Sequence, residues 1–100
     1  MMKNMNILIA YASKYGSTAQ IAENIALRLK KAGFEPKVMN AGDVTILEGY
    51  SAVVLGSAVY AGNWLKEAAD FLIKFKQDLT LCPVWFFSAG PTGKGDPVEQ

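Results

Sequence analysis

The chain has 100 residues, of which 51% are hydrophobic and 19% are charged, and its formal net charge is +1 at pH 7. This length supports one hydrophobic core but not two, and the apolar content excludes an intrinsically disordered chain, so we expect a single domain over residues 1–100. The balanced charge provides no basic stripe for nucleic acid and no acidic face for docking to basic partners.

A change of hydrophobic period marks the first two elements. Residues 7–11 form a continuous apolar run of strand length, which is typical of a strand covered on both faces. After this run, Ile21, Ile25 and Leu29 recur every four residues with polar residues between them. That spacing predicts one amphipathic helix beginning near Ser17.

The loop between this strand and this helix reads Ser13-Lys14-Tyr15-Gly16-Ser17-Thr18. The first turn of a helix offers unpaired N–H groups and the positive end of the helix dipole, and the hydroxyl groups of this loop add further donors. Gly16 lets the backbone approach an anion closely. These residue types are typical of a phosphate-binding loop, but they also suit a simple turn and helix N-cap. Lys14 would then either neutralise phosphate charge or extend into solvent.

The next segment returns to an extended pattern. Gly33 stands where a left-handed cap would end the helix, and a second strand is expected over Phe34–Met39. Pro36 places this strand at an edge of the sheet, because proline cannot donate to a ladder. We expect Ile46 and Leu47, in the connection that follows, to fold back onto the core.

Two further strands and one helix complete the pattern. The third strand is expected over Tyr50–Leu55, followed by a loop over Ala58–Gly62. Asn63 is a candidate N-cap for a helix from Trp64 to about Phe75. The predicted apolar face of that helix consists of Leu65, Ala69, Leu72 and Ile73. A fourth strand is expected over Pro83–Phe87.

Cys82 is the single cysteine of the chain and histidine is absent. One chain therefore cannot form a disulfide, a Cys/His zinc site or a Cys–His catalytic pair, and we expect Cys82 to be a small buried thiol. No stretch reaches the roughly 20 apolar residues that span a bilayer, and no signal-peptide pattern follows the first apolar run. We expect a cytoplasmic protein.

The alternation of strands and helices predicts right-handed β-α-β crossovers and a parallel sheet, which is the α/β fold class. In open sheets of this class, ligands bind beyond the carboxyl ends of the strands. Three strands end there in loops of small, polar or aromatic residues, at 13–18, 56–64 and 88–93. One loop suited to a phosphate and two suited to a flat ring indicate a site for flavin mononucleotide (FMN).

The chain resembles the flavodoxin-fold proteins, and most closely the menaquinone-dependent protoporphyrinogen oxidase group within that fold. The resemblance spans nearly the whole chain and is most specific in residues 7–18, 56–64 and 86–91. It implies a three-layer sandwich with strand order 2-1-3-4, in which the first loop holds the FMN phosphate and the other two enclose the ring. The candidate cofactor-binding residues are Ser13, Lys14, Tyr15, Gly16, Ser17, Thr18, Ser57, Ala58, Val59, Tyr60, Ala61, Gly62, Trp64, Ser88, Ala89, Gly90, Pro91 and Gly93. No residue is predicted to be catalytic or to bind a metal.

Two departures from this family pattern concern the C-terminal end. Flavodoxin folds have a fifth strand with a helix on either side, and the oxidase group has an additional segment associated with membrane or quinone contact. We expect the fifth strand and the last helix to be absent here, which leaves the fourth strand as an edge. Its uncharged run 84–87 is an aggregation hazard unless it is paired. We therefore expect a shortened chain, an incomplete gene product, or a homodimer that covers this edge.

The leading functional hypothesis is an FMN-dependent oxidoreductase. The resemblance implies a quinone or porphyrinogen substrate, or a redox partner protein, together with peripheral membrane contact. Tyr60 and Trp64 are candidates to flank the flavin ring, although Trp64 would equally suit a packing role at the start of a helix. A flavodoxin-type one-electron carrier is the first alternative, and the near-neutral composition counts against it. A cofactor-free module that retains the fold is the second.

Overall fold

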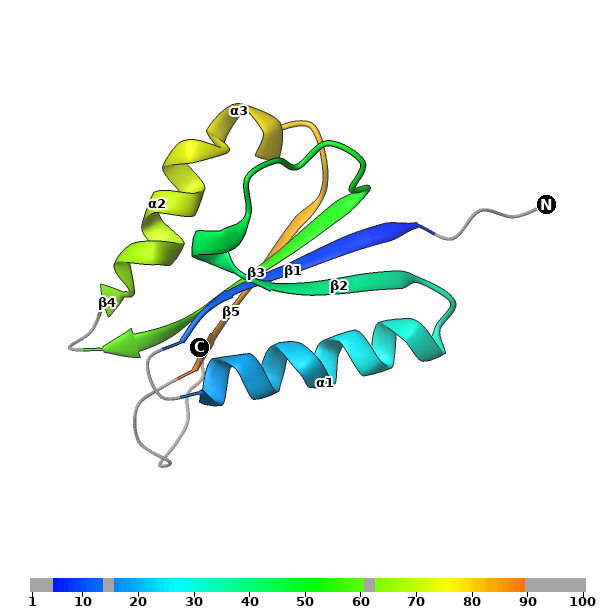
Figure 1. Ribbon diagram of the computed structural model, residues 1–100, viewed down its shortest axis with the longest axis horizontal. Helices are drawn as coiled ribbons and strands as arrows, with labels where there is room; N and C mark the ends of the chain where they lie inside the picture. The colour runs from blue at the N-terminus through cyan, green and yellow to red at the C-terminus, as the bar shows by residue number, and fades with distance from the viewer. Residues whose placement is uncertain (1–4, 14–15, 61–62, 90–100) are drawn as a thin grey trace.

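The computed structural model describes residues 5–13, 16–60 and 63–89, with Ser17 and Tyr60 described by their backbone alone. The strands are β1 (Asn6–Ala12), β2 (Glu35–Asn40), β3 (Ala52–Tyr60), β4 (Asn63–Trp64) and β5 (Val84–Ala89). The helices are α1 (Ser17–Lys31), α2 (Lys66–Lys74), α3 (Lys76–Leu79) and the short 3-10 helix η1 (Ala41–Asp43). Figure 1 shows three layers, with α1 on one face of the sheet and α2 and α3 on the other.

The sheet has the predicted topology. β1 pairs in parallel with β2 on one side and β3 on the other, and β5 pairs in parallel with β3. β4 is a two-residue strand that runs antiparallel to the end of β3. The long strands therefore follow the order β2-β1-β3-β5, which confirms the predicted order 2-1-3-4. Within the described part of the chain β2 pairs with β1 alone, so the edge position inferred from Pro36 is confirmed.

Helix α1 ends as its sequence predicts. Gly33 has φ 101°, the left-handed conformation that glycine adopts most easily. The N–H groups of Ala32 and Phe34 donate to the carbonyls of Arg28 and Leu29, at 3.1 and 3.0 Å. These bonds satisfy carbonyl groups that the end of a helix otherwise leaves unpaired. The basic residues Arg28, Lys30 and Lys31 in the last turn also face the negative end of the helix dipole.

Two hydrophobic cores lie on opposite faces of the sheet, because successive strand residues point in opposite directions. The core on the α1 side contains Ile7, Ile9, Ala22, Ala52 and Val54. The core on the α2 side contains Leu8, Ala10, Ala41, Val44, Leu47, Val53, Leu55, Phe71 and Phe75. β1 and β3 contribute to both cores, so the two central strands are buried on both faces, as the apolar runs predicted.

The predicted end of the second helix, near Phe75, is confirmed, whereas its predicted start and most of its predicted buried face are wrong, since Leu72 alone of that face packs against the core within α2. Asn63 lies in β4 and is not an N-cap, and the helix begins at Lys66 because the chain stays extended through Leu65, with φ −66° and ψ 152°. The helix buries Phe71 at 2% exposure, whereas Ile73 is 74% exposed. Phe71 and Phe75 lie one turn apart and their ring centroids are 4.8 Å apart. This aromatic pair sets which side of the helix faces the sheet.

Three smaller expectations are corrected by the structure. β3 continues to Tyr60, so the first part of the predicted loop 58–62 is strand. Leu47 is buried as expected, but Ile46 is exposed on the other side of the same connection. Cys82 is half-buried and not fully buried. In the described residues, no helix has the length and apolar character needed to cross a membrane.

The corrected face of α2 can be tested by two alanine substitutions. Phe71→Ala should lower the free energy of unfolding by about 3–5 kcal/mol, because it leaves a cavity in the core. Ile73→Ala should change it by less than about 0.5 kcal/mol, because this side chain is exposed. Urea denaturation of both variants measures the two changes, and the opposite ranking would contradict the observed face.

Candidate functional site

The three candidate loops begin side by side. The strand register places Ala12 of β1 beside Ser57 of β3, and Ser57 beside Ser88 of β5. All three strands run in the same direction, so the segments that follow these residues emerge at one edge of the sheet (Figure 1). The expected meeting of the loops at the carboxyl edge thus follows from the observed register.

The first loop leads directly into the N-terminus of α1. Gly16 precedes the helix with φ 93° and ψ −13°, and its N–H donates to Ser13 Oγ at 2.8 Å. Its carbonyl accepts from the N–H of Gln20 at 3.1 Å, which is the first bond of the helix. The N–H groups of the first turn have no acceptor within the helix, and no acidic residue stands in that turn. The positive end of the helix dipole is therefore available to an anion.

Thr18, in this first turn, is fully buried, and its Oγ1 has no hydrogen-bond partner among the described residues. A buried hydroxyl left unpaired costs roughly 1–3 kcal/mol, so folded proteins rarely retain one without a reason. A ligand that accepts or donates a hydrogen bond at this position would remove that cost. Thr18 is thus the described residue that points most directly to a bound group.

The second loop is held by a hydroxyl that forms two hydrogen bonds. Ser57 is fully buried, and its Oγ accepts from the N–H of Leu65 at 3.0 Å and donates to the carbonyl of Ala58 at 2.8 Å. The bond from Leu65 fastens β3 to the start of α2, and the bond to Ala58 orients the hydroxyl within β3. They give Ser57 a structural role that the sequence analysis did not identify, while its predicted contact with a cofactor stays a prediction.

The β3–β4 hairpin was also missed from the sequence. Val59 pairs with Trp64 and Tyr60 pairs with Asn63, so residues 61 and 62 alone separate the two strands. Two residues including a glycine, placed between β-branched or aromatic positions, are a known hairpin signal. Strand β4 is only two residues long, however, and the longer helical pattern after it concealed that signal.

Trp64 joins the second loop to the third. Its Nε1 donates to Ser88 Oγ at 3.2 Å, and its ring lies 6.0 Å from that of Phe86 with an interplanar angle of 56°. The indole is half-buried in these contacts. The structure therefore brings together two of the predicted site residues, Trp64 and Ser88, and gives Trp64 the packing role that the sequence left open beside ring stacking.

A glycine in the same region makes room for an aromatic ring. Gly56 and Phe87 are paired in the sheet, and a Cβ added to Gly56 would clash with the Phe87 ring. The ring lies on the α1 side, against the core under that helix. Gly56 thus allows close packing between β3 and β5 just before the candidate loops begin.

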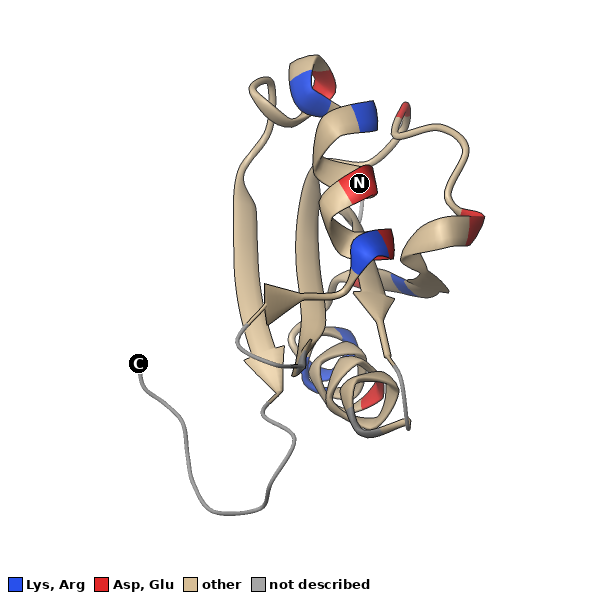
Figure 2. Ribbon diagram, turned by 90° about the vertical axis from the view of Figure 1, so that its left-hand side faces the viewer, with Lys and Arg blue, Asp and Glu red and all other residues tan. Residues whose placement is uncertain are grey.

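The described residues at this edge carry little charge. Figure 2, which views the left-hand side of Figure 1, shows the basic and acidic positions mainly on the helices and on the connections around the sheet. Lys66, in the first turn of α2, forms an ion pair with Asp70 at 3.0 Å. The hydrogen bond to Asp70 and the attraction of its charge raise the pKa of Lys66, which stays protonated at neutral pH. No cluster of three His, Cys, Asp or Glu residues suited to a metal occurs in the part of the chain that the structure describes.

Several predicted site residues lie outside the described part of the structure. They are Lys14, Tyr15, Ala61, Gly62, Gly90, Pro91, Gly93 and the side chains of Ser17 and Tyr60. The described candidates are Ser13, Gly16, Thr18, Ser57, Ala58, Val59, Trp64, Ser88 and Ala89. All of the described candidates belong to the ends of β1, β3 and β5 or to the segments that directly follow them.

Residues 8–99 match the family model of the flavodoxin domain. The chain belongs to the flavodoxin domain family. It is 29% identical over 86 residues to protoporphyrinogen IX dehydrogenase [quinone] of Escherichia coli (strain K12), covering 84% of this chain and 48% of that protein. It is 30% identical over 70 residues to a flavodoxin of Nitratidesulfovibrio vulgaris (strain DSM 19637 / Miyazaki F), covering 67% of this chain and 47% of that protein.

Solved structures show the same fold. A Fusobacterium nucleatum flavodoxin bound to flavin mononucleotide superposes with a TM-score of 0.70 at 26% identity, over 85% of this chain and 52% of that chain. Rubredoxin oxygen:oxidoreductase of Desulfovibrio gigas superposes with a TM-score of 0.77 at 20% identity, over 88% of this chain and 24% of that chain. The chain spans about half the length of the curated relatives it matches.

Substitution of Ser57 tests its structural role. Ser57→Ala should lower the free energy of unfolding by about 1–3 kcal/mol, because the N–H of Leu65 loses its acceptor. The exposed Ser51, just before β3, provides a matched control, and Ser51→Ala should cost less than about 0.5 kcal/mol. Chemical denaturation measures both values, and equal values would show that the Ser57 hydroxyl does not hold this hairpin.

Proposed function

We propose that this flavodoxin domain binds FMN at the carboxyl edge of its sheet and acts as an FMN-dependent oxidoreductase. The observation that carries the proposal is the buried, unpaired hydroxyl of Thr18 in the first turn of α1. Family membership and the FMN-containing flavodoxin structure support the choice of ligand.

The residues at the start of α1 suit a phosphate monoester. The turn that follows Gly16 supplies backbone N–H groups, and the absence of an acidic residue in that turn avoids repulsion of a dianion. Thr18 supplies a hydroxyl that lacks another partner. Ser13 already accepts from Gly16 and so shapes the loop, and a hydroxyl that accepts one hydrogen bond can also donate one to an oxygen.

The other two loops suit a planar ring. Trp64 and Ser88 connect these loops by a hydrogen bond, and Ser57 fixes the hairpin that carries Trp64. The described residues here are uncharged, which is compatible with an uncharged ring system. Tyr60 and Trp64 remain the candidates to flank the ring, and the contact of Trp64 with Phe86 would orient its indole for that role.

When bound, FMN itself supplies the redox chemistry, so the protein needs no catalytic nucleophile or metal of its own. The chain's residues would bind the phosphate, orient the ring and restrict the access of water. A chain with a single cysteine and no histidine is compatible with this division of roles.

Oxidation of a small substrate, or reduction of a quinone, is favoured over a carrier role by the low charge of the described residues at the candidate site. Proteins that carry electrons between partners commonly rely on complementary charged faces for rapid docking. The curated relatives include both kinds of protein, at 29% and 30% identity, so a flavodoxin-type carrier is the second candidate function.

The direct test of FMN binding is spectroscopic. The purified chain should carry visible flavin absorbance or acquire it when FMN is added, and bound FMN should show quenched fluorescence beside aromatic residues. Riboflavin, which lacks the phosphate, should bind more weakly because α1 contributes through that group. An absence of FMN uptake would contradict the proposal.

Thr18→Val separates ligand binding from helix stability. The substitution replaces the hydroxyl by a methyl group of similar size. A hydrogen bond to a charged group contributes roughly 1.5–3 kcal/mol, so the affinity for FMN should fall about tenfold or more. The stability of the FMN-free protein should be unchanged or raised, because an unpaired buried hydroxyl has been removed. Fluorescence titration and urea denaturation measure the two effects.

The exposed Thr45 provides the control for this experiment, because it lies in the connection after β2, away from α1. Thr45→Val should leave both FMN affinity and stability within error of the unchanged protein. If Thr18→Val lowers stability and leaves FMN affinity unchanged, the hydroxyl serves the fold and not the ligand.

Turnover distinguishes the two candidate functions. An oxidoreductase loaded with FMN should reduce a soluble quinone with a chemical electron donor at a rate that saturates with quinone concentration. A carrier should show no such saturation and should take up its two electrons in two well-separated one-electron steps. Both measurements use the same FMN-loaded protein.

A further inference from the structure

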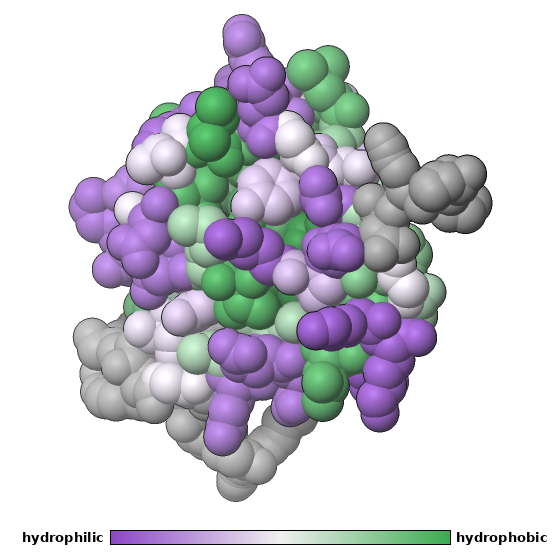
Figure 3. Space-filling view, turned by 45° about the vertical axis from the view of Figure 1, so that its right-hand side comes forward, coloured by the Kyte–Doolittle hydropathy of each residue, from purple (hydrophilic) through white to green (hydrophobic). Residues whose placement is uncertain are grey.

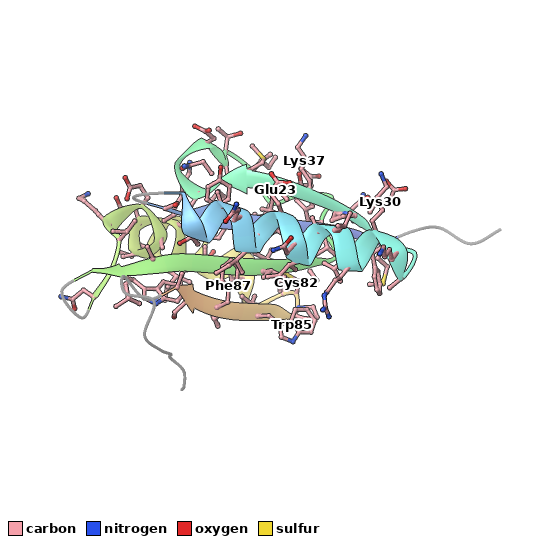
Figure 4. All side chains as sticks on the ribbon, turned by 90° about the horizontal axis from the view of Figure 1, so that it is seen from below. Glu23, Lys30, Lys37, Cys82, Trp85 and Phe87 are labelled. Carbon is pink, nitrogen blue, oxygen red and sulfur yellow. The ribbon has the colours of Figure 1, made fainter. Side chains whose placement is uncertain are left out.

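Two serines stand side by side near the ends of β3 and β5. Ser57 and Ser88 are partners in the parallel register. Figure 4 shows Trp85 and Phe87 along β5 on the side of α1, so Ser88, one residue further, faces α2. Ser57 faces α2 as well, because it follows the buried Leu55 of that core by two residues. Both hydroxyl groups therefore lie on the α2 face at the carboxyl edge of the sheet.

The two hydroxyl groups bind consecutive residues of one segment. Ser57 Oγ accepts from the backbone N–H of Leu65 at 3.0 Å, and Ser88 Oγ accepts from the indole Nε1 of Trp64 at 3.2 Å. The backbone of Trp64 also pairs with Val59 in the β3–β4 hairpin. The segment 64–65 is thus held through its main chain by β3 and through its aromatic side chain by β5.

The indole of Trp64 has a second contact on β5. Its ring lies 6.0 Å from the Phe86 ring in a tilted arrangement, a geometry that aromatic pairs prefer. A hydrogen bond at the ring nitrogen and a contact between rings together restrict rotation of the indole about its side-chain bonds. The indole therefore has its orientation before a ligand arrives, and it loses little rotamer freedom on binding one.

The hydrogen bond to Ser88 also limits what the indole can offer to a ligand. An indole has one N–H donor and no acceptor, and here Ser88 takes that donor. What Trp64 presents to a ligand is then its π surface, which packs on a flat aromatic ring by offset stacking or edge-to-face contact. This chemistry suits a planar ring better than a sugar or a charged group.

Another face of the molecule has a different character. β4 lies at the left of Figure 1, whereas Figure 3 brings the right-hand side of that view forward. The face drawn in Figure 3 is largely hydrophilic, and its hydrophobic residues form separate small groups. The described residues of that face do not favour an uncharged planar ring, which agrees with a ring site beside the hairpin.

We propose that Ser88 is a positioning residue that acts through Trp64, and that Ser57 and Ser88 together hold the indole where it flanks the flavin ring. This inference rests on the proposed function, because it concerns the ring end of the same FMN site. It also changes the role predicted for Ser88, which the sequence placed among the residues that contact the cofactor. The hydroxyl of Ser88 binds the indole, and the indole contacts FMN.

NMR of the FMN-free protein tests the hydrogen bond by itself. The chain has two tryptophans and therefore two indole N–H signals, and Trp64→Phe identifies the signal of Trp64. Ser88→Ala should shift that signal and speed its exchange with water, whereas Ser88→Thr, which keeps a hydroxyl group, should leave it protected. The indole signal of Trp85, on the opposite face of β5, should not change in either variant.

A double-mutant cycle with FMN then separates positioning from direct contact. Ser88→Ala should weaken FMN binding about threefold to tenfold and reduce the quenching of flavin fluorescence, and Ser88→Thr should restore both. In a Trp64→Phe background, Ser88→Ala should have no further effect, because phenylalanine has no N–H for the serine to bind. The exposed Ser51 provides the control, and Ser51→Ala should leave affinity and quenching unchanged.

Two results would overturn the inference while FMN still binds. An effect of Ser88→Ala on FMN affinity that persists in full in the Trp64→Phe background would show that the serine contacts FMN directly. A Trp64 signal that Ser88→Ala leaves unchanged would show that this hydrogen bond does not hold the indole. A chain that takes up no FMN contradicts the proposed function itself, and this inference with it, so the two failures are distinguishable.

Discussion

Burial of β1 on both of its faces is the constraint on which the other elements depend. Leu8, Ile9 and Ala10 are fully buried, and the strand lies between β2 and β3 with parallel pairing on both sides. A strand with apolar contacts above and below cannot slip by one residue without exposing one core and disrupting the other. Its end at Ala12 is therefore fixed, and with it the starting point of the loop that leads to α1.

The candidate site follows from that fixed end. Because Ala12, Ser57 and Ser88 lie in one row, the register alone brings three separate parts of the chain to the same edge. Hydrogen bonds then hold the neighbouring loops, since Ser57 anchors the start of α2 and Trp64 reaches Ser88 on β5. In contrast to these hydrogen-bonded side chains, Thr18 at the N-terminus of α1 has a buried hydroxyl with no partner among the described residues. Such an arrangement would let one rigid sheet position both ends of an elongated ligand.

The same sheet has two edges with opposite properties. Pro36 and its charged neighbours protect the β2 edge, whereas Trp85 and Phe86 make the β5 edge apolar on both sides. β5 ends at Ala89, so its edge and the candidate site are adjacent along the same strand.

The sequence alone determined the α/β class, the strand order and the place of the candidate site, because these depend on local hydrophobic period and on the family resemblance. The apolar run of β1, the spacing of Ile21, Ile25 and Leu29, and Gly33 at the end of α1 are local signals that tertiary contacts did not override. The start and the buried face of α2 were decided only by tertiary structure. The apolar spacing in that segment did not show which face of the helix is buried. Phe71 and Phe75 pack against β1 and β3, so their face is buried and the face that contains Ile73 is exposed. The hydrogen bonds of Ser57 and Trp64 and the orphaned hydroxyl of Thr18 likewise required the fold, because each depends on which atoms from distant segments lie within reach.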